Sequence, residues 1–135
     1  SKSPSSVFAS ALAKCKEDPR IVEALGDPIK GHGEMTSRGR ARHVNSVEYE
    51  SNGKTYIRVT FYLKGSKGIR ATVQCETRRD TPKNHFRYLF VQMDTYPRDV
   101  IIVEDNRLTE DPLWIKMDAH LFIHMFNDYG RMLHN

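Results

Sequence analysis

The chain has 135 residues, the length of one domain, and it is long enough to bury a hydrophobic core of its own. Its composition, 39% hydrophobic and 28% charged, excludes a disordered or fibrous protein, and no apolar run approaches the roughly 18 residues of a membrane span. The net charge of +4 is uneven, because residues 1–107 carry 19 basic against 13 acidic side chains, whereas residues 108–135 carry 2 against 4. The basic part predicts an anionic partner.

Two short helices are predicted at the start of the chain. Ser6 is a candidate N-cap, and apolar residues then recur at helical spacing from residue 8 to residue 15. Pro19 ends this pattern, because proline disfavours helical geometry in the residue before it. A second helix follows, with Asp18 as its cap and Pro19 in its first turn. Gly26 suits the left-handed conformation that commonly ends a helix.

The pattern then changes from helical to alternating, which predicts an antiparallel sheet. Residues 55–63 and 68–76 place apolar side chains at every second position. Asn52-Gly53 and a glycine-rich turn between the two segments predict a meander with one buried face. Residues 86–93 and 100–103 are apolar on both faces, as expected for strands that are covered on both sides or lie centrally in a sheet.

A further helix is predicted from Asp111-Pro112 onward, where apolar positions spread wider than one helical stripe and would touch two surfaces. We therefore expect an α+β fold, in which two N-terminal helical segments pack on a mainly antiparallel sheet of about five or six strands and a C-terminal helix is added. Residues 1–107 are expected to form a binding domain, and residues 108–135 a helical extension of unknown role.

Three arginines, Arg38, Arg40 and Arg42, occupy every second position of the segment "TSRGRARHV", with no acid among them. In an extended segment they would share one face and form an arginine comb. Two interpretations stay open. The comb is either a solvated strand whose charges prevent unwanted sheet pairing, or an anion-binding surface. In the second case the candidate neighbours are Lys30, Arg78, Arg79 and Lys83.

The sequence contains no constellation of catalytic or metal-binding residues. Cys15 and Cys75 fall on the apolar faces of their elements, where a thiol behaves as a small hydrophobe. His120 and His124 are four residues apart on the predicted C-terminal helix, but they lack the further ligands that zinc needs. The sequence therefore predicts no enzyme, no metal and no cofactor.

A single-stranded RNA-binding module is the alternative function. Phe86, Tyr88 and Phe90 alternate along one strand, as the stacking residues of an RNA-recognition sheet do. Basic residues lie close to them in the sequence: Arg78, Arg79, Lys83 and Arg87. The strand lacks the basic-Gly-aromatic-Gly opening of that sheet. A buried core strand is the competing interpretation, and nucleic acid is not the expected partner.

Five segments in colinear order, "ALAKCK", "GDPIKGHGEMT", "RGRARHV", "FRYLFV" and "YPRDVIIVEDNR", resemble the intermembrane-space domain of the Tim-twenty-one family. Its members are regulatory subunits of the presequence translocase in the mitochondrial inner membrane. The resemblance covers roughly residues 5–107. It implies a protein without enzymatic activity, with a presequence and a membrane helix upstream of this domain. It also implies binding to the acidic intermembrane-space tail of the outer-membrane translocase receptor, and contact with translocase subunits and respiratory-chain complexes.

The resemblance suggests a partner for the arginine comb, although it does not assign those residues. Guanidinium groups bond carboxylates in pairs, and each exposed contact is worth about 0–1 kcal/mol. The expected complex is therefore weak, fast and salt-sensitive. Past Arg107 no family motif is recognised. Residues 108–135 either pack on the sheet, bind another partner or are foreign to the natural gene.

Overall fold

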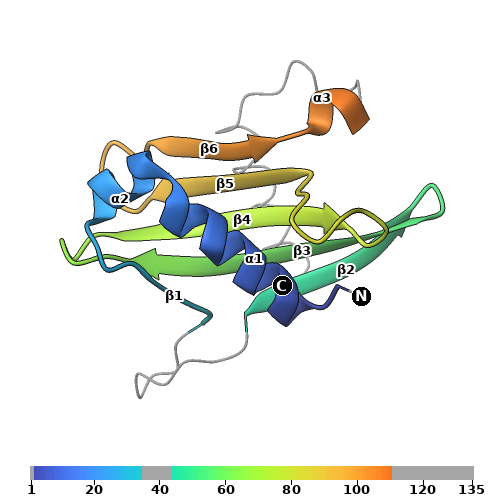
Figure 1. Ribbon diagram of the computed structural model, residues 1–135, viewed down its shortest axis with the longest axis horizontal. Helices are drawn as coiled ribbons and strands as arrows, with labels where there is room; N and C mark the ends of the chain where they lie inside the picture. The colour runs from blue at the N-terminus through green and yellow to red at the C-terminus, as the bar shows by residue number, and fades with distance from the viewer. Residues whose placement is uncertain (1, 35–43, 111–135) are drawn as a thin grey trace.

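The computed structural model describes residues 2–34 and 44–110, which form a two-layer α+β domain (Figure 1). Helices α1 (Pro4–Glu17) and α2 (Pro19–Leu25) pack on one face of a six-stranded sheet. The short helix α3 (Arg107–Glu110) follows the last strand. The strands are β1 (Lys30–His32), β2 (Asn45–Ser51), β3 (Lys54–Lys64), β4 (Arg70–Arg78), β5 (Tyr88–Met93) and β6 (Val100–Asp105). The predicted α+β class is confirmed, and the helix predicted from Asp111 onward lies outside the described residues.

Every strand pairing in the sheet is antiparallel, and the strand order is β1-β3-β4-β5-β6 with β2 also paired to β3. Strands β1 and β2 share one edge of β3, because His32 lies opposite Tyr62 and Asn45 lies opposite Thr60. The chain therefore leaves the edge of β3 after β1 and returns to the same edge to form β2.

The N-terminal helices begin and end largely where the sequence predicts, with one correction. The N-cap of α1 is Ser3, not Ser6, because Pro4 already starts the helix. Ser6 instead completes a capping box: its backbone N–H donates to Ser3 Oγ at 3.2 Å, and the Ser3 N–H donates to Ser6 Oγ at 2.9 Å. Asp18 caps α2, and Gly26 ends it with a φ of 82°.

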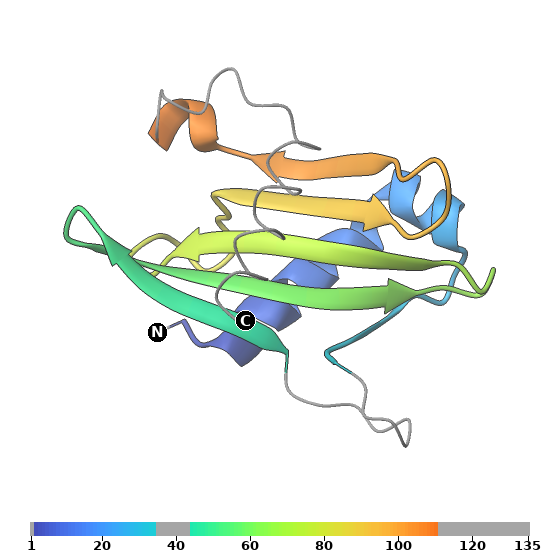
Figure 2. The same cartoon turned by 180° about the vertical axis from the view of Figure 1, so that it is seen from behind.

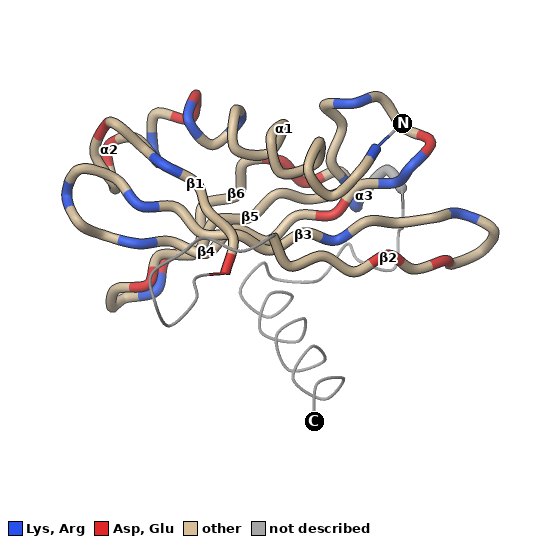
Figure 3. The backbone as a smooth tube through the Cα atoms, turned by 90° about the horizontal axis from the view of Figure 1, so that it is seen from below, with Lys and Arg blue, Asp and Glu red and all other residues tan. Residues whose placement is uncertain are grey.

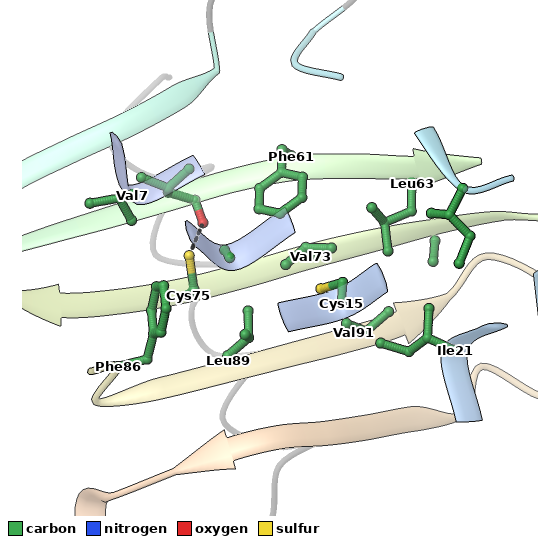
Figure 4. Packing of buried hydrophobic residues seen from close by; sticks show 14 of the residues in the cluster. Val7, Cys15, Ile21, Phe61, Leu63, Val73, Cys75, Phe86, Leu89 and Val91 are labelled. Carbon is green, nitrogen blue, oxygen red and sulfur yellow. Dashed lines mark hydrogen bonds between the residues drawn. The ribbon is translucent and has the colours of Figure 1, made fainter. Parts of the chain in front are cut away.

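The helix-covered face of the sheet carries the apolar alternation that the sequence predicts. Phe61 packs edge-on against Phe8 of α1, with ring centroids 4.8 Å apart. Cys15 of α1 and Cys75 of β4 both lie in this layer, and Cys75 Sγ points at the Val59 carbonyl, 3.7 Å away (Figure 4). Buried around them are Ile57, Val59, Leu63, Ala71, Val73, Leu89 and Val91.

The opposite side of the sheet is called the far face here. It is defined by residues that are directly paired across neighbouring strands: Tyr56, Arg58, Gln74, Glu76, Tyr88 and Phe90. Strand β5 is buried on both faces, as predicted. The same prediction is wrong for β6, which is an edge strand and leaves Ile102 43% exposed on the far face.

Candidate functional site: a row of cations at one end of the sheet

Three basic side chains lie side by side across three neighbouring strands. Lys30 of β1 is directly opposite Lys64 of β3, which is directly opposite Arg70 of β4. Directly paired residues share one face and have Cα atoms roughly 4.5–5.5 Å apart, so the three form one row, called the cation row. All three side chains are exposed. Within residues 2–34 and 44–110, no carboxylate forms an ion pair with any of them.

Two carboxylates near the cation row accept hydrogen bonds from hydroxyl groups and, within the described residues, form no ion pair with the row. Glu34 accepts a hydrogen bond from the Tyr62 hydroxyl at 2.8 Å, and Asp94 accepts one from the Thr72 hydroxyl at 3.1 Å. Burial, followed by the hydrogen bond to Glu34, raises the pKa of Tyr62 to about 12, so this hydroxyl stays a neutral donor. The positive charge of the cation row is therefore available to an external anion.

The cation row borders a pocket of about 480 Å³ that is lined by Pro28, Lys30, His32, Lys64, Gly65, Ser66 and Arg70. The turn between β3 and β4 forms one wall of this pocket and is hydrogen-bonded to the end of α2. The Ser66 N–H donates to the Gly26 carbonyl at 2.9 Å, and the Lys67 N–H donates to the Leu25 carbonyl at 3.0 Å. These two hydrogen bonds fix the position of the turn. Lys64 and Arg70, on either side of it, therefore stay directly opposite each other.

The like charges of the cation row should destabilise the folded domain slightly. We expect Lys64→Gln to raise the free energy of unfolding by up to about 0.5 kcal/mol at low ionic strength, because opposed like charges in a sheet repel. Thermal unfolding in low and high salt measures this, and the gain should vanish in high salt. Lys83→Gln, which removes an exposed lysine outside the row, is the control. An equal effect from both changes would contradict the proposed repulsion.

The other predicted binding residues lie at the opposite end of the sheet from Lys30. Arg78 is opposite Tyr56, eight residues along β3 from Lys64, a separation of about 27 Å in an extended strand. Arg79 and the exposed Lys83 follow Arg78 in the chain. Figure 3 shows basic residues at both ends of the sheet. The structure therefore does not gather Lys30 with Arg78, Arg79 and Lys83 in one cluster.

The arginines of this second end are held by the protein's own acids. Arg78 pairs with Asp80, and Arg79 pairs with Glu48 at 2.9 Å. The hydrogen bond from Arg78 is the main cause that lowers the pKa of Asp80 below its usual range. An external anion would have to compete with these carboxylates, which makes this end a weaker anion site than the cation row.

The arginine comb, Arg38, Arg40 and Arg42, lies outside the described residues. The described chain stops at Glu34, beside Tyr62, and resumes at Val44, just before the residue that pairs with Thr60. Sequence reasoning missed Lys64 and Arg70. The signal that could have identified them is the turn "GSKG", since residues on either side of a hairpin turn face each other.

The aromatic residues proposed for RNA stacking are buried and do not share a face. Phe86 is 1% exposed and belongs to the helix-covered core, whereas Tyr88 and Phe90 are 0% exposed on the far face, with ring centroids 5.1 Å apart. The expectation that all three rings lie on one face is therefore wrong. Base stacking needs a solvent-exposed aromatic ring, and none of these three rings is exposed.

Neither cysteine has the character of a nucleophile. Both thiols are free and buried. Burial, and secondarily the charge of Asp18, raises the pKa of Cys15 to about 12, and burial raises the pKa of Cys75 as well. The structure thus confirms the placement of both cysteines on apolar faces. In the described part of the chain, no group of three or more His, Cys, Asp or Glu residues could hold a metal ion; His120 and His124 lie outside it.

The fold and the cation row define a small two-layer α+β domain that presents a row of exposed basic side chains at one end of its sheet. The chain belongs to the TIM21 family, here called Tim-twenty-one: the family model matches residues 1–107. Tim21 of Xenopus laevis, a mitochondrial import inner membrane translocase subunit, is 44% identical over an alignment of 110 residues that covers 79% of this chain and 47% of that protein. Its counterpart from Homo sapiens is 40% identical over an alignment of 114 residues that covers 82% of this chain and 46% of that protein.

The solved structure of the IMS domain of the mitochondrial import protein Tim21 from S. cerevisiae has the same fold. Its TM-score is 0.60 at 15% identity, over 77% of this chain and 94% of that chain. The chain spans about half the length of the curated relatives it matches. Family membership assigns the protein to the mitochondrial inner membrane; the solved yeast domain with the same fold is the IMS domain of that Tim21. Among the described residues, no helix has the length and apolar character needed to cross a membrane.

Proposed function

We propose that the protein is a tethering subunit, without catalytic activity, of the presequence translocase in the mitochondrial inner membrane. In this role the domain binds the acidic intermembrane-space tail of the outer-membrane translocase receptor. It also contacts other translocase subunits and links import to respiratory-chain complexes. The observation that carries the proposal is the cation row, three exposed cations that have no carboxylate partner within the described residues. Membership of the TIM21 family supports the choice of partner.

The arginine comb is within covalent reach of the cation row. An extended chain covers at most about 3.6 Å per residue, so the Cα atom of Arg38 lies no more than about 14 Å from that of Glu34, whatever path the chain takes. By the same limit, the Cα atom of Arg42 lies within about 7 Å of that of Val44. Glu34 itself is bonded to Tyr62, two residues from Lys64. The proposed site therefore combines the cation row with Arg38, Arg40 and Arg42.

Arg78, Arg79 and Lys83 are proposed as weaker contributors, because the two arginines are already paired with Asp80 and Glu48. Each exposed contact with a carboxylate is worth about 0–1 kcal/mol, so several must act together. A flexible acidic peptide can engage the row and the comb in sequence, and it can leave rapidly when either contact opens. This behaviour suits a contact that must form and release during transport.

The test is a titration with an acidic peptide across a salt series. Neutralising the cation row by Lys30→Gln, Lys64→Gln and Arg70→Gln should weaken binding about tenfold, since about 1.4 kcal/mol corresponds to a factor of ten. Neutralising the comb at Arg38, Arg40 and Arg42 should have a similar effect. The matched control removes the same charge at the other end of the sheet, through Arg78→Gln, Arg79→Gln and Lys83→Gln, and should weaken binding less. Equal losses for the row and the control would reject the assigned site.

Two further measurements separate the proposed partner from others. Single-stranded RNA titrated under the same conditions should bind more weakly than the peptide. Tighter binding of RNA that survives added salt would favour the RNA-binding alternative.

A pull-down from mitochondria with the row-neutralised variant should lose the outer-membrane receptor. Translocase and respiratory-chain subunits, detected separately, show which further contacts depend on the same end of the domain.

A further inference from the structure

The loop between β5 and β6, residues 94–99, carries an aromatic side chain that lies almost wholly in water. Tyr96 is 89% exposed. The other exposed large hydrophobic side chains within residues 2–34 and 44–110, on β2, β6 and α3, are 41–59% exposed. Partial exposure of single apolar side chains is ordinary on a protein surface. The Tyr96 ring goes well beyond that, and it contributes nothing to the hydrophobic core.

This loop, called the Tyr96 loop, lies close to the cation row. Figure 2 shows it at the same end of the sheet as the turn between β3 and β4. The Asp94 N–H donates to the Arg70 carbonyl at 3.0 Å, and antiparallel neighbours have Cα atoms about 4.5–5.5 Å apart. Tyr96 is two residues further on, at most about 7 Å away. The Cα atom of Tyr96 therefore lies within about 13 Å of that of Arg70, the last cation of the row.

The Tyr96 loop is braced by bonds of its own. The Met93 N–H donates to the Asp99 carbonyl at 2.9 Å and closes the base of the loop, and the Asp99 N–H donates to the Pro97 carbonyl at 2.9 Å. The Arg98 guanidinium lies 5.6 Å from the centroid of the Tyr96 ring, within the range of a cation–π contact. A ring restrained in this way loses little conformational freedom when it binds. Tyrosine and arginine are also enriched among the side chains that dominate binding energy.

The charge changes sign between the cation row and the Tyr96 ring. The row holds three cations, whereas the loop holds the carboxylates of Asp94 and Asp99 against the one guanidinium of Arg98. Both carboxylate side chains are exposed, and no ion pair among the described residues includes them. Because like charges repel, an acidic segment that lies on the row is disfavoured over the ring. The part of a partner that reaches Tyr96 should therefore be apolar.

We propose that the Tyr96 loop is an anchor site, which binds one aromatic or large aliphatic side chain of the acidic partner next to its acidic run. This inference rests on the proposed function, because the cation row has to hold the acidic run. An extended peptide advances about 3.3 Å per residue, so the anchor residue lies within about four residues of the run. The row then supplies charge and association rate, and the ring supplies selectivity among acidic segments.

Two synthetic peptides titrated into the whole chain test the anchor. One has a run of glutamates and a phenylalanine three residues beyond it, and the other has serine in place of the phenylalanine. The unaltered chain should bind the phenylalanine peptide about tenfold more tightly. Tyr96→Ala should remove this preference without changing the affinity for the serine peptide, and Tyr96→Phe should keep it. The matched control is Leu108→Ala, which truncates an exposed leucine of α3 and should change neither affinity.

A change of charge tests the same surface independently of the ring. Asp94→Asn combined with Asp99→Asn should raise the affinity for an all-glutamate peptide about threefold at low salt, because the repulsion beyond the row is removed. The gain should shrink in high salt. The loop should keep its shape, since its closure uses the backbone of Asp99 and an asparagine at position 94 can still accept the hydrogen bond from Thr72. An unchanged affinity would contradict the proposed reversal of charge.

Failure of the anchor and failure of the proposed function give different results. Equal affinity of the unaltered chain for the two peptides, or an equal loss for both with Tyr96→Ala, would overturn the anchor and leave the cation row in place. If neither peptide binds, the proposed function fails and the anchor fails with it. Vesicles of anionic phospholipid are the third probe. Vesicle binding that Tyr96→Ala abolishes, without a preference between the peptides, would overturn the proposal in favour of a membrane contact.

Discussion

Replacing Glu76 with leucine should lower the free energy of unfolding by about 3–5 kcal/mol, because it breaks a buried ion cluster from one side. The Glu76 side chain is 0% exposed. Its carboxylate accepts hydrogen bonds from Arg58 Nε at 2.6 Å, from Arg87 Nη1 at 2.6 Å and from the Tyr49 hydroxyl at 2.9 Å. Leucine fills a similar volume but leaves two arginines without this carboxylate. Urea unfolding at neutral pH measures the loss.

The matched control is Glu48→Leu on β2, which removes an ion pair with Arg79 in the turn after β4. The Glu48 side chain is 49% exposed, so this pair should contribute no more than about 1 kcal/mol. Combining Glu76→Leu with Arg58→Met and Arg87→Met should recover much of the loss, since an apolar cluster needs no compensating charge. Similar small losses at Glu76 and Glu48 would show that Glu76 is not the centre of a buried cluster.

The sequence alone predicts the elements whose signals are local. The alternation in β3 and β4 and the Asn-Gly turn depend on neighbouring residues, and the structure has them where expected, with φ values of 51° at Asn52 and 76° at Gly53. Ser3 was missed as the cap of α1 because two serines satisfy the same rule, and only the capping box shows how they share it. The edge position of β6 could not be predicted, because strand order is set by distant pairings.

In the candidate site, too, local features can be predicted from the sequence, whereas features that depend on strand pairing cannot. The arginine comb stands out in the sequence because its three residues lie within five consecutive positions. The cation row does not, because Lys30 and Lys64 are 34 positions apart and meet only through strand pairing. The alternation in residues 68–76 likewise leaves Glu76 on the side opposite the apolar residues, and it does not reveal that Arg87, eleven positions away, neutralises this carboxylate inside the protein. Charges on a sheet can be assigned to binding or to internal pairing only once the register is known.

Replacing Gly65 with alanine should lower the free energy of unfolding by about 3 kcal/mol or more, at the upper end of overpacking effects. A Cβ atom at Gly65 would clash with the backbone carbonyl groups of Leu25 and Gly26, which no side-chain rotation can relieve. Either the end of α2 or the β3–β4 turn must move. That movement breaks the two backbone bonds that join them, from Ser66 to Gly26 and from Lys67 to Leu25. Thermal and urea unfolding measure the effect.

Gly53→Ala is the control that distinguishes the effect of a steric clash from that of backbone strain. A Cβ atom there meets nothing within 4 Å, but the φ of 76° is unfavourable for alanine, at roughly 1–2 kcal/mol. The two variants should also differ in function. Gly65→Ala shifts the turn between Lys64 and Arg70 and should weaken acidic-peptide binding even where the domain is fully folded, whereas Gly53→Ala, at the far end of β3, should leave affinity unchanged. Unaltered peptide affinity in folded Gly65→Ala protein would mean that the register of the cation row does not matter, because a flexible partner then reads only its total charge.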